Sequence, residues 1–140
     1  MLKLLVADKN VSYRKQIASI LIESGYDVMV TDSAVQAIQN VLNHEAHVLL
    51  LGTELEELNS ADLLPLLKQC NRKLAIILVA DEASLPLMRK LRKEGIFYHA
   101  LRPTEADGEE EIRQVVKCAI QNLSKTSSKK ICLFPESKMQ

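Results

Sequence analysis

The most constraining feature of the sequence is an uninterrupted apolar run in its middle, from Val48 to Leu51, which ends at Gly52. A strand with one face in water alternates apolar and polar residues, whereas a run without alternation indicates a strand buried on both faces of a parallel sheet. Open α/β sheets place their ligand or catalytic crevice at the carboxyl ends of the strands. We therefore expect a functional site around Gly52 and the two residues that follow it, Thr53 and Glu54.

The composition is typical of one globular domain. The chain has 140 residues, of which 47% are hydrophobic, and its 18 basic residues balance 18 acidic ones. This balance gives no reason to expect binding to nucleic acid or to an anionic membrane. The sequence does not start with a secretory signal pattern, and no apolar run approaches membrane-spanning length, so we expect a cytoplasmic protein. Three widely spaced cysteines without a C-x-x-C pattern indicate neither a disulfide framework nor a zinc site.

Strand-like and helix-like segments alternate along the whole chain. The apolar runs predict strands over 3–7, 27–31, 48–51, 74–79 and 97–101. Helical periodicity follows each of them, and the last helix ends near residue 123. Parallel strands need right-handed crossovers, and both faces of this sheet need covering by helices. The predicted fold is therefore a five-stranded, doubly wound parallel sheet of order 2-1-3-4-5 with five helices, as in flavodoxin.

Capping residues indicate where the helices begin. Ser33, followed three residues later by Gln36, has the pattern of a capping box. Asn59 or Ser60 can cap the third helix and Ser84 the fourth. The predicted strand order has its switch point between the first and third strands, which places the end of the first strand beside Gly52.

The chain resembles the receiver domain of two-component response regulators, the CheY-like family, over residues 1–123. In that family the first strand ends in two acids, and here Asp8 is followed by Lys9. The third strand ends in the phospho-accepting aspartate, where this chain has Gly52. Ala80 stands where the family has a threonine or serine, and Arg102 stands before a proline where the family has a lysine. The resemblance therefore implies a degenerate pseudo-receiver.

The resemblance also implies that the chemistry of the family is lost. Phosphoryl transfer to a carboxylate needs the carboxylate itself, a divalent cation held by oxygen ligands, and a hydroxyl that grips the product. Gly52 has no side chain to attack with, and Ala80 has no hydroxyl. Lys9 would bring a positive charge to the metal position. We expect no aspartyl phosphorylation, no magnesium or other cofactor, no catalytic residue and no enzymatic activity.

Four charged side chains remain near the predicted site. One hypothesis is that they pair, Arg102 with Asp8 or Glu54 and Lys9 with the other, so that protein charges fill the pocket. The alternative is that they are separate and solvated. A surrogate phosphoacceptor at Thr53, Glu54 or Asp62 is a further, weaker hypothesis.

Other residues are candidates for switching or for contacts with partners. The resemblance places His99 at a position where the family often has a mobile aromatic residue, but a half-exposed strand histidine is the simpler interpretation. A basic cluster that includes Arg89, Arg92 and Lys93 lies on the predicted fourth helix, near the acidic run 109–111. These opposite charges can support a homodimer through the fourth helix, fifth strand and fifth helix, or they can simply be solvated. Without interleaved aromatic residues the cluster does not indicate nucleic-acid binding.

Two further segments carry weaker hypotheses. His44 and His47 flank a turn and could ligate a metal, although a solvated turn is the simpler interpretation. Residues 124–140 form a polar linker followed by an apolar tetrapeptide at 131–134, which either docks on a protein surface or is disordered.

The functional prediction is an atypical receiver that acts by phosphorylation-independent protein–protein contact. Its partner in trans would be a histidine kinase or an effector. The alternative from another class is a module that binds a small anion through Lys9 and Arg102, in a pocket widened by Gly52 and Ala80.

Overall fold

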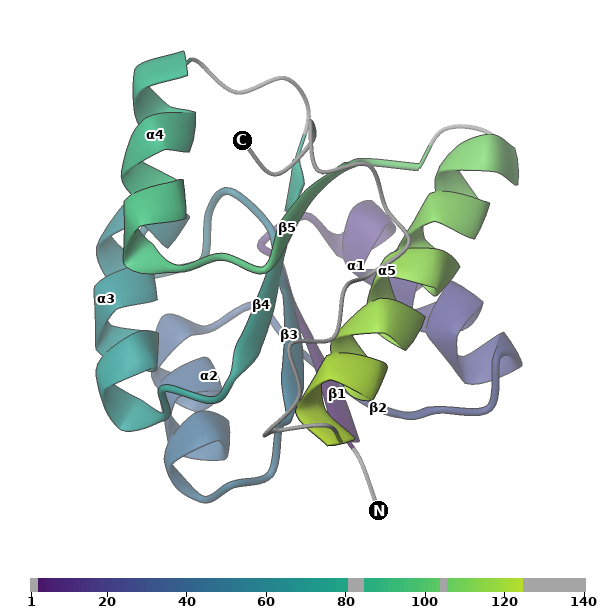
Figure 1. Ribbon diagram of the computed structural model, residues 1–140, viewed down its shortest axis with the longest axis horizontal. Coiled ribbons are helices and arrows are strands. Elements are labelled where there is room, and N and C mark those ends of the chain that lie inside the picture. Colours follow the sequence, from purple (N-terminus) through teal and green to yellow (C-terminus); the bar gives the residue numbers. More distant parts are fainter. Residues whose placement is uncertain (1–2, 81–84, 104–105, 125–140) are drawn as a thin grey trace.

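The predicted α/β architecture is confirmed. A computed structural model describes residues 3–80, 85–103 and 106–124 (Figure 1). Within these residues five strands alternate with five helices: β1 (Lys3–Ala7), α1 (Val11–Glu23), β2 (Asp27–Thr31), α2 (Ala34–Leu42), β3 (Val48–Leu51), α3 (Ser60–Cys70), β4 (Ala75–Ala80), α4 (Leu85–Glu94), β5 (Tyr98–Leu101) and α5 (Ala106–Ser124). The strands are parallel in the order β2-β1-β3-β4-β5.

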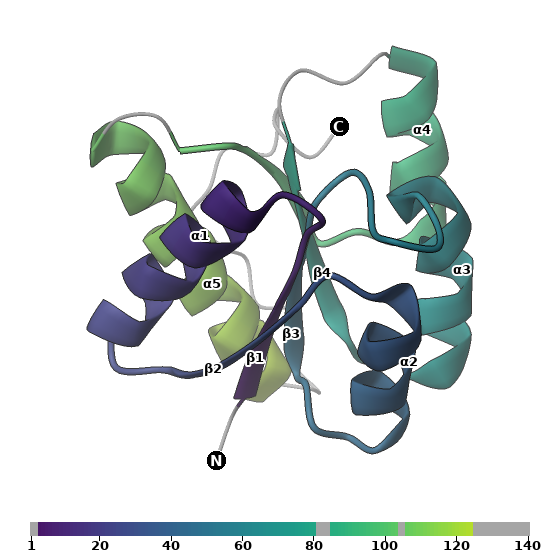
Figure 2. The same cartoon turned by 180° about the vertical axis from the view of Figure 1, so that it is seen from behind.

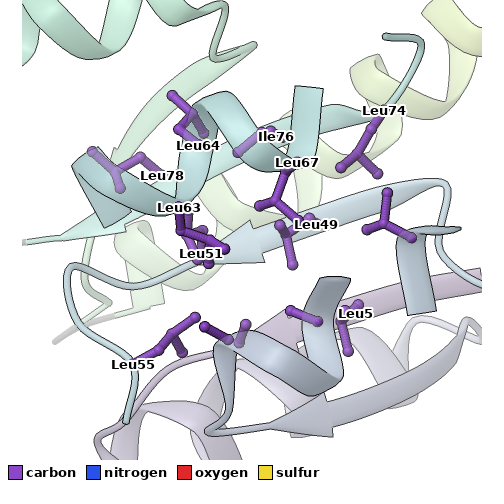
Figure 3. Packing of buried hydrophobic residues seen from close by; sticks show 14 of the residues in the cluster. Leu5, Leu49, Leu51, Leu55, Leu63, Leu64, Leu67, Leu74, Ile76 and Leu78 are labelled. Atoms are coloured by element: carbon purple, nitrogen blue, oxygen red, sulfur yellow. The ribbon is translucent and has the colours of Figure 1, made fainter. Parts of the chain in front are cut away.

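The sheet is the middle of three layers. Helices α1 and α5 cover one face, and α2, α3 and α4 cover the other (Figures 1 and 2). Each face has its own apolar core, and Figure 3 shows the core beneath α2 and α3, where leucines of β3 meet leucines of α3. Every residue of β3 is buried, which is the property that its unbroken apolar sequence predicted.

The register of the central strands positions the candidate site. Leu51 at the end of β3 pairs with Ala7 at the end of β1 and with Leu78 of β4. Gly52 N–H donates to the Ala7 carbonyl at 2.8 Å. Gly52 and Asp8 therefore leave the sheet side by side at its carboxyl edge, as the predicted strand order requires.

The first turn of α2 differs from the predicted capping box. Ser33 Oγ accepts from the Gln36 N–H at 3.2 Å, but the Gln36 side chain donates to Asn40 instead of returning to Ser33. Glu57, from the β3–α3 connection, caps this turn instead. Its Oε1 accepts from the Ala34 N–H at 2.7 Å, and its Oε2 accepts from Ser33 Oγ at 2.9 Å. These bonds lower the pKa of the Glu57 carboxyl and join the β3–α3 connection to α2.

Several predicted boundaries shift by one residue. β4 begins at Ala75 because the Leu74 N–H donates to the Asn71 carbonyl in a turn, and β5 begins at Tyr98. Asn59 is the N-cap of α3, its side chain accepting from the Asp62 N–H at 2.9 Å. The predicted cap Ser84 and most of the predicted segment 124–140 lie outside the described residues. No helix in the described ranges is both long and apolar enough to cross a membrane.

Two leucines of α3 test the core directly. Leu63 is fully buried beneath the sheet, whereas Leu66 on the same helix is 42% exposed. We expect Leu63→Ala to lower the free energy of unfolding by about 2–5 kcal/mol, because it removes buried methyl groups and leaves a cavity. Urea denaturation measures the change. Leu66→Ala is the matched control, with an expected effect within about 0.5 kcal/mol, and equal losses in the two variants would contradict the packing described here.

Candidate functional site

Asp8 is the central residue of the candidate site. It follows β1 directly, and only 3% of its surface is exposed. Its Oδ1 accepts from the Asn10 N–H at 2.9 Å, while its backbone carbonyl accepts from Arg14 Nη1 at 2.8 Å. Asn10 is also the N-cap of α1, so the turn that begins this helix also orients the carboxylate.

The Asp8 carboxylate lies directly over Gly52. A Cβ atom built on Gly52 would overlap the Asp8 carboxyl carbon and would lie 2.5 Å from Oδ2 and 2.7 Å from Oδ1. Non-bonded carbon and oxygen atoms cannot lie this close to one another in a protein interior. The carboxylate of Asp8 therefore occupies the space where any side chain at position 52 would have to begin.

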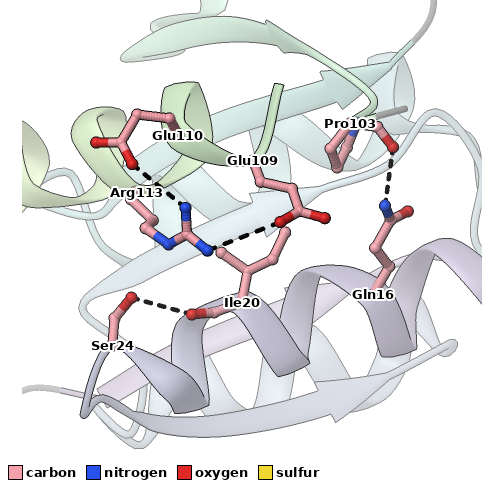
Figure 4. A network of polar contacts seen from close by, with 7 residues as sticks. All are labelled: Gln16, Ile20, Ser24, Pro103, Glu109, Glu110 and Arg113. Atoms are coloured by element: carbon pink, nitrogen blue, oxygen red, sulfur yellow. Dashed lines mark hydrogen bonds and ion pairs between the residues drawn. The ribbon is translucent and has the colours of Figure 1, made fainter. Parts of the chain in front are cut away.

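Arg102 closes the site from the end of β5. Its Nη2 lies 3.7 Å from Asp8 Oδ2, and its guanidinium carbon lies 4.3 Å from the centre of the Tyr13 ring. This stacking on an aromatic face suits the planar guanidinium. Gln16 Nε2 donates to the Pro103 carbonyl at 2.9 Å (Figure 4), so α1 also holds the segment that follows Arg102.

Burial dominates the electrostatics of Asp8. Removal of the carboxyl from water raises its pKa above the ordinary value. The Asn10 N–H and the positive charges of Arg102 and Arg14 lower the pKa but do not reverse the effect of burial. The carboxylate is thus held in position by packing and one short hydrogen bond, and its distant ion pair offsets only part of the cost of its burial.

The other predicted site residues divide into two groups. Ala80 ends β4 and is fully buried, whereas Lys9 and Glu54 are exposed. Of the hypothesised pairs, Arg102 lies near Asp8, whereas no ion pair joins Lys9 to Glu54 among the described residues, and the Lys9 N–H donates to the Glu54 carbonyl at 3.0 Å. Two solvated side chains gain little from pairing. Thr53 is half-buried, and Asp62 lies exposed in the first turn of α3.

The predicted contact surface has its acidic residues bound within the domain. Arg113 pairs with Glu109 at 3.7 Å and with Glu110 at 3.3 Å, all on α5 (Figure 4). Glu111 Oε2 accepts from the hydroxyl of the buried Tyr98 at 3.3 Å. The acidic run therefore stabilises α5 and its contact with β5.

The basic side of that surface is more open to solvent. Arg89 and Lys93 on α4 are exposed, Arg92 is partly exposed, and His99 on β5 is half-buried. In the described part of the chain, no ion pair joins α4 to the acidic run.

The two histidines considered as metal ligands have roles in the local backbone structure. His47 Nδ1 accepts from the Lys3 N–H at 3.1 Å, and His44 has a positive φ of 57° in the turn after α2. No group of three or more histidine, cysteine, aspartate or glutamate side chains that could hold a metal ion occurs within the described ranges.

Sequence reasoning missed two contributors, Tyr13 and Glu57. Helical periodicity places Tyr13 on the apolar stripe of α1, and it gives no sign that the Tyr13 ring also stacks on Arg102. Glu57 lies 23 residues from the backbone N–H that it caps, so no local pattern could have indicated this role.

Comparisons with known proteins identify the family and agree with the fold. The response regulator receiver domain family matches residues 4–117. A CheY-like response regulator receiver domain protein from Methanospirillum hungatei JF-1 has the same fold, with a TM-score of 0.81, 17% identity, and coverage of 90% of this chain and 98% of that chain. The signal receiver domain of an HD domain-containing protein from Pseudomonas fluorescens Pf-5 gives a TM-score of 0.80 at 18% identity, covering 92% of this chain and 93% of that chain.

The solution structure of the beryllofluoride-activated NtrC4 receiver domain dimer is also similar, with a TM-score of 0.77, 19% identity, and coverage of 88% of this chain and 99% of that chain. A search of curated protein sequences finds no match. At such identities the structures show the fold, and the family match carries the assignment. Since that match spans residues 4–117 of 140, the chain belongs to the response regulator receiver domain family, the receivers of two-component signalling.

Proposed function

We propose that this receiver domain acts through protein–protein contact and accepts no phosphoryl group. The observation that carries the proposal is the Asp8 carboxylate seated where a side chain on Gly52 would begin. By family resemblance, position 52 is the place of the phospho-accepting aspartate. Here that position has no carboxylate, and the neighbouring carboxylate is buried against it and held by backbone and arginine.

The charges around the site do not suit a magnesium ion. A hard divalent cation needs several oxygen ligands in an open arrangement. Lys9 is positively charged and exposed at the position of the family's second acid, and Arg102 lies beside the only remaining acid of the motif, Asp8. These features support a non-enzymatic domain without a bound metal.

The geometry gives less support to a small-anion site at this position. An anion drawn by Lys9 and Arg102 would have to approach the buried Asp8 carboxylate, which already fills the space left by Gly52. Repulsion between like charges in a poorly solvated site is costly. We therefore do not place a ligand there.

The surface of α4, β5 and α5 is the proposed contact region, on the basis of family resemblance and exposed charge. Arg89 and Lys93 are free to meet an acidic partner surface, whereas Glu109 and Glu110 already pair with Arg113. The similar NtrC4 receiver is a dimer, so a second copy is one candidate partner. A cytoplasmic histidine kinase or effector is the other, and His99 on β5 would lie at such a contact.

Phosphorylation is tested by intact-mass spectrometry of the purified protein after incubation with acetyl phosphate and magnesium. We expect no added phosphoryl mass, because position 52 has no nucleophile. The control is Lys9→Asp/Gly52→Asp/Ala80→Thr, which restores the second acid, the acceptor and the hydroxyl of the family and keeps Asp8 as the first acid. A magnesium-dependent phosphoryl adduct on the wild-type protein would overturn the proposal.

The state of Asp8 is tested by the pH dependence of stability. A carboxyl whose pKa is raised on folding contributes stability that is present below its unfolded value and is lost as the pH rises through its folded value. Asp8→Asn keeps an acceptor for the Asn10 N–H but cannot ionise. We expect the melting temperature of this variant, relative to wild type, to rise between pH 4 and pH 7.

The matching control is Asp62→Asn, at an exposed carboxylate on α3. This variant measures what the loss of one exposed carboxylate does over the same interval, and the rise for Asp8→Asn should exceed it. If Asp8→Asn instead becomes less stable than wild type as the pH rises, the ion pair with Arg102 outweighs burial, and the electrostatic description of the site is wrong.

A further inference from the structure

A cavity lies at the amino ends of β4 and β5, at the opposite end of the sheet from Asp8 and Gly52. Its volume is about 530 Å³, within the range of roughly 300–1,000 Å³ that is typical of small-molecule sites. The α3–β4 turn, the α4–β5 connection and the carboxyl end of α5 border it. Figure 1 shows the carboxyl end of α5 beside the amino ends of the strands.

Among the residues that the structure describes, the charged side chains that line this cavity are all positive. They are Lys68, Arg72 and Lys73. In the ranges that the structure describes, none of the three forms an ion pair. Glu94 lines an adjoining hollow that shares Lys68 and Arg72, yet it pairs with neither. Three cations around one cavity repel one another, and a bound anion would relieve that repulsion.

The Lys68 ammonium is held in place by hydrogen bonds to the turn that carries Arg72 and Lys73. Lys68 Nζ donates to the Leu74 carbonyl at 3.0 Å and to the Arg72 carbonyl at 3.4 Å. An ammonium has three donor hydrogens, so one remains for a ligand. Asn71 Oδ1 accepts from the Lys73 N–H at 2.9 Å and fixes the same turn. Partial burial lowers the pKa of Lys68, an effect that a nearby anion would oppose.

Gly95 makes room for Lys68. Its φ of +100° suits glycine, and a Cβ at this position would lie 3.1 Å from Lys68 Cε. The glycine at the end of α4 thus leaves space for the Lys68 side chain, which lines the cavity.

Apart from Asn122, the side chains that line the rest of the cavity are apolar. Leu74 is buried, and Ile96, Phe97 and Leu123 are each partly exposed. Phe97 and Leu123 pack against the core beneath α1 and α5. A simple inorganic ion would leave this wall in contact with water, whereas a ligand with an apolar body would cover it.

We propose that this cavity binds a small amphipathic anion, with its phosphate or carboxylate group held by Lys68, Arg72 and Lys73 and its apolar body against Phe97 and Leu123. The proposal does not depend on the phosphorylation state of the domain, because Asp8 and Gly52 lie at the other end of the sheet.

The test is a titration of the full-length, nitrogen-15-labelled protein followed by amide chemical shifts. The probes are phenyl phosphate and phenylacetate, which distinguish the two anionic groups. The controls are inorganic phosphate, which has no apolar body, and benzyl alcohol, which has no charge. We expect at least one amphipathic anion to shift the signals of Lys73, Phe97 and Leu123 saturably, with at least tenfold tighter binding than either control. An absence of saturable shifts at these residues overturns the proposal.

Two matched charge-reversal variants distinguish binding of the probe in this cavity from attraction of the probe to the overall charge of the protein. Arg72→Glu/Lys73→Glu alters two exposed cations of the cavity, and Lys15→Glu/Lys117→Glu alters two exposed cations elsewhere, on α1 and α5. We expect the first variant to lose at least tenfold in affinity for the bound probe and the second to bind as wild type does. Equal weakening in both variants would show attraction to overall charge only and would overturn the proposal. Well-dispersed amide spectra confirm that both variants fold.

Discussion

The close contact between the Asp8 carboxylate and the backbone of Gly52 determines what the carboxyl edge of this sheet can do. Strand order brings the ends of β1 and β3 together, and close packing lets only one group fill the space between them. In this chain that group is the carboxylate, oriented by the Asn10 N–H and faced by Arg102. The space that a side chain at position 52 would fill is therefore taken by the Asp8 carboxylate.

The sequence predicted the fold well because its main signals are local. The unbroken run Val48–Leu51 indicated a central strand, and the alternation of strands and helices fixed the order that sets Asp8 beside Gly52. Side-chain contacts were harder to predict. Lys9 and Glu54 have opposite charges and lie on adjacent loops, but an ion pair between two solvated side chains gains little free energy. Glu57 caps α2 from a distant connection, and such a contact exists only once the chain has folded.

The two ends of the sheet differ in charge and in access. At the carboxyl edge a buried acid, Asp8, lies beside an arginine that stacks on Tyr13. At the amino edge three cations and a largely apolar wall line a cavity, and hydrogen bonds join Lys68 to the turn that carries the other two cations. Under the proposal that the domain accepts no phosphoryl group, a small molecule or a partner could still regulate it, because a ligand shifts an equilibrium by differential binding wherever it binds.

A double-mutant cycle between positions 8 and 52 tests the central claim most directly. Gly52→Ala is measured by urea denaturation in the wild-type background and in an Asp8→Gly background. We expect a loss of about 1–3 kcal/mol in the wild type, since the new methyl group must displace the carboxylate. In the Asp8→Gly background, where the space is empty, the loss should largely disappear. Equal losses in both backgrounds would show that Asp8 does not occupy the space at Gly52, and would contradict the account.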